Sequence, residues 1–70
     1  MAIKILIVDD SAELTLLLHK ALSREGYEID VAGDGLEGLR KAHDLRPDLV
    51  LLDIMMPGMS GFDLLSRLRE

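Results

Sequence analysis

The chain has 70 residues, with 13 acidic side chains against eight Lys and Arg, and a formal net charge of −5. At this length it forms at most one small domain, near the lower limit for an independent hydrophobic core. The basic residues are scattered, which argues against direct binding to nucleic acid, since that needs a basic patch. The chain has no cysteine, which excludes disulfides and thiolate metal sites and fits a cytoplasmic protein.

Two elements are predicted in the first third of the chain. Residues 3–8 (IKILIV) form a nearly continuous aliphatic run, typical of a parallel strand covered on both faces, and too short for a secretory signal or a membrane span. A helix follows, capped by Asp10 with Glu13 or by Ser11, and Gly26 is placed to end it. Its apolar stripe at helical spacing is Leu14, Leu17, Leu18, Ala21 and Leu22.

The next two elements repeat this order. Residues 27–32 (YEIDVA) alternate, which predicts a half-exposed edge strand. A Gly-Asp-Gly turn leads into a second helix, weakened by Gly38 and ended by Pro47, because the residue before proline avoids the helical region. We expect its inward residues to be Leu36, Leu39 and Ala42.

Residues 49–54 (LVLLDI) form the third predicted strand, again fully apolar. After a glycine-rich turn, Ser60 caps a third helix, with Leu64, Leu65 and Leu68 on its buried side. Three strand-helix units with short connections indicate an α/β fold with a doubly wound sheet of three parallel strands. With the strand order 2-1-3, the first and third strands are neighbours.

Three aspartates fall at strand ends: Asp9 and Asp10 after the first strand and Asp53 after the third. In open α/β sheets, ligands bind outside the carboxyl ends of the strands where the winding direction switches. Carboxylates that meet there repel each other and need a cation to remain ionised together. An all-oxygen cluster favours Mg²⁺, and a carboxylate can also act as a nucleophile that forms an aspartyl-phosphate. The alternative is that these residues are a helix cap and two solvated loop aspartates.

Three segments, ILIVDDS, DGLEGL and PDLVLLDIMMPGMSGFDLL, resemble the receiver domain of two-component response regulators over the whole chain. The resemblance implies that Asp53 is the phosphoacceptor, that a sensor histidine kinase supplies the phosphoryl group, and that the chain is not a conventional enzyme. It also implies an Mg²⁺ site made by Asp9, Asp10, Asp53 and the backbone carbonyl of Met55. Residues 1–70 are then one truncated receiver domain, a flavodoxin-like (βα)3 half-domain with the strand order 2-1-3.

The resemblance also indicates what such a half lacks. The family pattern continues with a Ser or Thr, a lysine and an aromatic switch residue on later strands, which are not in this sequence. Lys4 cannot replace that lysine, because at about 3.3 Å per residue it lies roughly 16 Å from the Asp9 end of its strand. Phosphorylation is therefore expected to be weak, and switching absent.

Other functions remain open. The main rival is a non-switching interaction module that dimerises or binds full-length receivers or kinases. For either function we expect a homodimer through the third strand and third helix, with buried contacts that include Leu49, Leu51, Ile54, Leu65 and Leu68. Two further classes are disfavoured. A haloacid-dehalogenase-type phosphatase needs a second Asp where Met55 stands. A flavin carrier needs a hydroxyl-rich phosphate loop and stacking aromatics, and the only aromatic residues are Tyr27 and Phe62. His19 and His43 are expected on the surface, since neither has a second ligand at metal-site spacing.

Overall fold

The computed structural model describes residues 2–53. Five elements follow in the order β1 (Lys4–Val8), α1 (Ala12–Arg24), β2 (Glu28–Ala32), α2 (Gly35–Leu45) and β3 (Leu49–Leu52). The predicted third helix, with its cap Ser60 and its apolar residues Leu64, Leu65 and Leu68, lies outside the described residues. No helix within residues 2–53 is long and apolar enough to cross a membrane.

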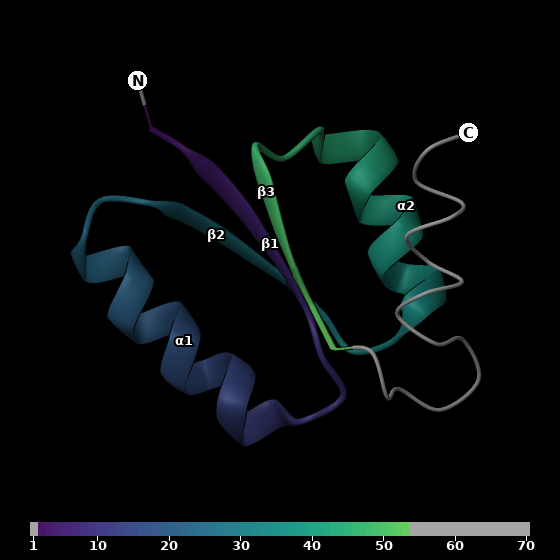
Figure 1. The fold of residues 1–70 in the computed structure, drawn as a ribbon, viewed down its shortest axis with the longest axis horizontal. Coiled ribbons are helices and arrows are strands. Elements are labelled where there is room, and N and C mark those ends of the chain that lie inside the picture. Colours follow the sequence, from purple (N-terminus) through teal and green to yellow (C-terminus); the bar gives the residue numbers. More distant parts are fainter. Residues whose placement is uncertain (1, 54–70) are drawn as a thin grey trace.

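The three strands form one parallel sheet in the order β2-β1-β3. Leu6 at the centre of β1 lies opposite Asp30 of β2 and Val50 of β3. The sheet separates α1 from α2, so that each helix packs on a different face (Figure 1). The predicted α/β class, the parallel pairing and the strand order are confirmed, and two helices fall within the described part of the chain.

The core lies around β1, because this strand is hydrogen-bonded on both edges and covered on both faces. Its last four residues, Ile5 to Val8, are at most 4% exposed. Leu39 and Ala42 of α2 pack against the fully buried Leu6 and Val8, as predicted. Leu36, however, is 67% exposed, so its predicted inward position is wrong. It lies about 100° round the helix from the buried Gly35, outside the face that meets the sheet.

The buried side of α1 also differs from the predicted stripe. Thr15 is the buried residue of this helix, flanked by the half-buried Leu18 and Leu22. Its hydroxyl donates to the carbonyl of Ala12 at 3.1 Å, so burial leaves no polar atom without a partner. Since Thr15 sets the face that meets the sheet, the predicted stripe is wrong for its exposed members, which are Leu14, Leu17 and Ala21.

The turns set how far each helix runs. Ser11, rather than Asp10, caps α1, and its hydroxyl accepts the Leu14 N–H at 3.3 Å. The left-handed backbone of Gly26, with φ of 90°, confirms the predicted end of this helix. At the end of α2, Arg46 adopts φ of 48° directly before Pro47. Proline disfavours the right-handed helical conformation in the residue before it, so α2 stops there.

Candidate acidic site

The backbone fixes two aspartates at the carboxyl end of the sheet. The Asp9 N–H donates to the carbonyl of Ala32 at 3.0 Å, and the Asp53 N–H donates to the carbonyl of Val8 at 2.9 Å. Both bonds continue the parallel ladders one residue past the assigned strands. The positions of Asp9 and Asp53 are therefore set by β1, the most buried element of the described chain.

A local turn orients the first of these carboxylates. Asp9 Oδ1 accepts the backbone N–H of Ser11 at 2.9 Å, in the turn that joins β1 to α1. Asp10 lies between them and is exposed, whereas Asp9 and Asp53 are half-buried. The N–H of Ser11 thus supports Asp9 while its hydroxyl caps α1. The sequence predicts Ser11 only as a cap; the signal for its second role is an Asp two residues before the cap.

The structure brings the three predicted aspartates together. Asp9, Asp10 and Asp53 each offer a carboxylate oxygen, and these oxygens lie within 4.8 Å of one another. Two unit charges about 4 Å apart repel by roughly 1 kcal/mol in bulk water and about 4 kcal/mol near a protein surface. A divalent cation would offset this repulsion, and three carboxylates with room for water fit the oxygen-rich, partly hydrated coordination of Mg²⁺. The fourth predicted ligand, the Met55 carbonyl, lies outside the described residues.

The remaining candidate residues do not join this cluster. His19 and His43 are exposed on α1 and α2, as expected. Of the three lysines, Lys4 begins β1 at the opposite end of the sheet, Lys20 is exposed on α1, and Lys41 is bound to Asp30. Within residues 2–53, the acidic cluster therefore carries no lysine contact among those the structure defines.

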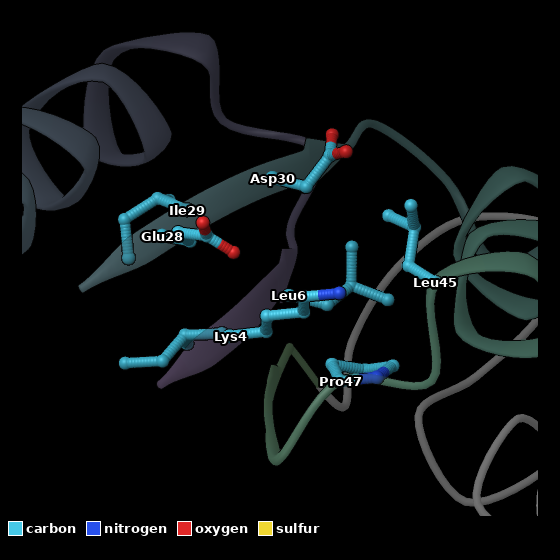
Figure 2. A pocket seen from close by; sticks show the side chains of 8 residues that line it. Lys4, Leu6, Glu28, Ile29, Asp30, Leu45 and Pro47 are labelled. Carbon is cyan, nitrogen blue, oxygen red and sulfur yellow. The ribbon is translucent and has the colours of Figure 1, made fainter. Parts of the chain in front are cut away.

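A hollow of the described chain lies away from the acidic cluster. It has a volume of 280 Å³ and lies among the amino-terminal halves of β1 and β2 and the end of α2 (Figure 2). Leu6, Ile29 and Leu45 give it an apolar lining, and Lys4 and Glu28 place charges at the strand starts. Because parallel strands run in one direction, this hollow and the acidic cluster are at opposite ends of the sheet. The hollow is therefore no part of the acidic site.

Comparison with known proteins identifies the family to which this fold belongs. Residues 5–70 match the family model described as "Response regulator receiver domain". This chain belongs to the response regulator receiver family. It is 50% identical over 66 residues to the DNA-binding response regulator MtrA of Mycobacterium tuberculosis, covering 94% of this chain and 29% of that protein. It is 43% identical to the PhoP regulator of alkaline phosphatase synthesis in Bacillus subtilis, covering 96% of this chain and 28% of that protein.

Solved structures of receiver proteins also resemble this chain in fold and sequence. The chemotaxis protein CheY4 of Vibrio cholerae superposes with a TM-score of 0.95 at 38% identity, over 99% of this chain and 57% of that one. The response regulator TrrA of Thermotoga maritima, solved in complex with Mg²⁺ and BeF, gives a TM-score of 0.90 at 46% identity, over 96% of this chain and 58% of that one. The receiver chain thus spans less than a third of the curated relatives and under two thirds of these structures.

Proposed function

We propose that this receiver acts in two-component phosphorelay signalling, with Asp53 as the residue that accepts a phosphoryl group from a sensor histidine kinase. The observation that carries the proposal is the convergence of Asp9, Asp10 and Asp53 at the carboxyl end of the β1–β3 pair. Asp53 is the member supplied by β3, and its backbone is held by Val8 while its carboxylate reaches the cluster. The family membership of residues 5–70 supports the same reaction class.

The chemistry needs one nucleophile and a means of balancing charge. An oxygen of the Asp53 carboxylate attacks the phosphorus of a phospho-histidine, an O–P bond forms, the P–N bond breaks, and its electron pair stays on the imidazole nitrogen. Asp9, Asp10 and Asp53, with the carbonyl of Met55, are the proposed Mg²⁺ ligands. The bound ion supplies positive charge to the phosphoryl oxygens. The Ser11 N–H holds Asp9 in the orientation that the cluster needs.

A small phosphodonor tests this role of Asp53. With Mg²⁺ present, we expect intact-mass spectrometry to find one added phosphoryl group on the receiver and none on Asp53→Asn. Asp48→Asn is the matched control, since Asp48 also adjoins β3 but lies at its other end, bonded to Lys4. Equal labelling of wild type and Asp53→Asn would refute the assignment.

A second proposal concerns assembly: the chain forms a homodimer through β3. Leu49 is 49% exposed and Leu51 is half-buried, and within residues 2–53 β3 pairs with β1 alone. An apolar strand edge of this kind favours pairing with another chain. The other proposed contacts, Ile54, Leu65 and Leu68, lie outside the described residues. Light scattering coupled to size-exclusion chromatography should give the mass of a dimer, and a concentration-independent monomer would overturn this proposal.

A further inference from the structure

The outer edge of β2 is the second place where strand pairing could extend the sheet. The Glu28 N–H donates to the carbonyl of Ile3 at 2.9 Å, and the Ala32 carbonyl accepts the Asp9 N–H at 3.0 Å. These bonds direct the backbone groups of Glu28 and Ala32 toward β1. Successive peptide groups of a strand point in opposite directions, so the N–H and carbonyl of Val31 point to the outer edge. Exposed edge groups of this kind are a template for another strand.

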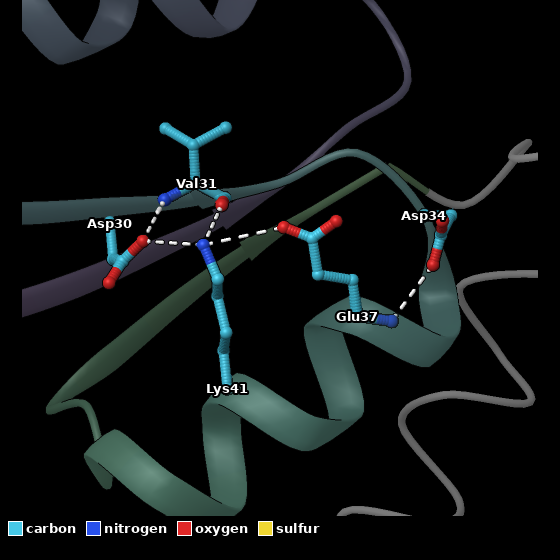
Figure 3. A network of polar contacts seen from close by, with 5 residues as sticks. All are labelled: Asp30, Val31, Asp34, Glu37 and Lys41. Carbon is cyan, nitrogen blue, oxygen red and sulfur yellow. Dashed lines mark hydrogen bonds and ion pairs between the residues drawn. The ribbon is translucent and has the colours of Figure 1, made fainter.

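Both backbone groups of Val31 are already bonded to side chains of its neighbours. Its N–H donates to Asp30 Oδ1 at 2.8 Å, and its carbonyl accepts from Lys41 Nζ at 2.6 Å. The same ammonium lies 2.8 Å from Asp30 Oδ1 and 3.3 Å from Glu37 Oε1 (Figure 3). Asp30 and Lys41, bonded to each other and to Val31, form what we call the β2 bracket.

The β2 bracket joins two elements at the surface. Asp30 belongs to β2 and Lys41 to α2, on the sheet face that α2 covers. The side chain of Lys41 is 27% exposed and that of Asp30 is 44% exposed. The bracket is therefore accessible to solvent, and the desolvation that weakens deeply buried ion pairs is small here. The i, i+4 pairing of Glu37 with Lys41 further favours the extended lysine conformation.

We propose that the β2 bracket closes the outer edge of β2 against strand addition by a second copy of this chain. The strand it excludes is β3, whose four residues (LVLL) are uncharged and whose Leu49 is half-exposed. Pairing of β3 from one copy with β2 of the next would be head-to-tail, and such contacts build rings or open chains of molecules. This inference concerns β2 alone and is independent of the phosphoacceptor role of Asp53.

The exclusion follows from what an incoming strand would have to break. It would need the N–H and carbonyl of Val31, both of which Asp30 and Lys41 occupy. It would also place an ammonium and a carboxylate against an apolar strand, and a charge removed from water without its partner is costly. The β2 bracket therefore prevents strand addition, as charged side chains on edge strands do in other sheets. In addition, it provides hydrogen-bond partners for the N–H and carbonyl of Val31.

Two variants break the bonds of the β2 bracket, and a third variant is a control for the change in charge. Lys41→Met keeps the length of the stem and removes the donor, and Asp30→Asn/Lys41→Met removes both charges at an unchanged net charge of −5. Lys20→Met, on the exposed surface of α1, is the control for the loss of one positive charge. We expect both bracket variants to show a mass that rises with concentration beyond that of wild type and of Lys20→Met. Masses equal to the control would overturn the proposal.

Hydrogen exchange on the wild-type chain gives a readout that does not depend on whether the variants fold. Ile29 and Val31 share the outer edge, but the bracket holds Val31. We expect the Val31 amide to exchange at least about tenfold more slowly than that of Ile29, which corresponds to about 1.4 kcal/mol. Equal exchange of the two amides would show that the edge is open in solution and would overturn the proposal by itself.

Discussion

Gly38→Ala is expected to destabilise the receiver although it replaces glycine with the best helix former. An added methyl carbon at this position of α2 would lie 2.8 Å and 2.9 Å from the two γ-methyl carbons of Val8. Val8 is fully buried and β-branched, so its methyl groups have no free rotamer to occupy. Since Val8 directly precedes Asp9, the same contact holds α2 next to the acidic site.

The magnitude follows from two opposing effects. Replacing glycine by alanine inside a helix stabilises by about 1 kcal/mol, and forcing one extra carbon into a packed core costs about 1–3 kcal/mol. The net expectation for Gly38→Ala is a loss of roughly 0–2 kcal/mol in the free energy of unfolding. With Val8→Ala as background the obstructing methyls are gone, so the same substitution should stabilise by about 1 kcal/mol.

The assay is a double-mutant cycle by urea unfolding, followed by far-UV circular dichroism. All four chains are measured in the same sucrose concentration, because Val8→Ala alone removes buried apolar surface and sucrose strengthens burial. The expected signature is a change of sign between the two backgrounds. A stabilising Gly38→Ala in the wild-type background, or equal effects in both backgrounds, would refute the contact with Val8 as the reason for glycine.

Three further predictions use other parts of the structure. In an NMR titration with Mg²⁺, the amides at the three clustered aspartates should shift first, and shifts confined to Glu28 would contradict a metal site there. The hydrogen bond from Lys41 holds the pKa of Asp30 below its ordinary value of 3.8. The stability that Asp30 contributes is therefore present above pH 3.8 and is lost as the pH falls through the lower pKa of the folded state. The difference in unfolding free energy between wild type and Asp30→Asn should shrink as the pH falls below 3.8, and a constant difference would exclude the bond. Asp34→Ala removes the side chain that accepts the Glu37 N–H at 2.8 Å and should cost about 1 kcal/mol in urea unfolding, and an unchanged midpoint would show that this cap is dispensable.

The sequence alone determined the order of the elements and the place of the acidic cluster. Aliphatic runs at residues 3–8 and 49–54 and helical spacing between them are local signals, and each is read within one element. The convergence of Asp9, Asp10 and Asp53 also followed from sequence, because parallel strands all end at the same edge of the sheet. Local patterns determine features of the backbone: the direction of a strand, the position of a turn and the residue that follows the end of a strand.

Only the tertiary structure decided which side chains meet across elements. The aliphatic residues of α1 are too many to identify the buried face. Its buried residue is Thr15, whose hydroxyl is satisfied within the helix and so tolerates burial. Gly38 lowers the helix propensity of α2, but beside Val8 there is no space for a larger residue. Asp30 and Lys41 are eleven residues apart on different elements, so no periodicity relates them. Each of these contacts depends on the distance and rotation of a helix over the sheet, which are set by the packing of the whole core and not by any single stretch of sequence.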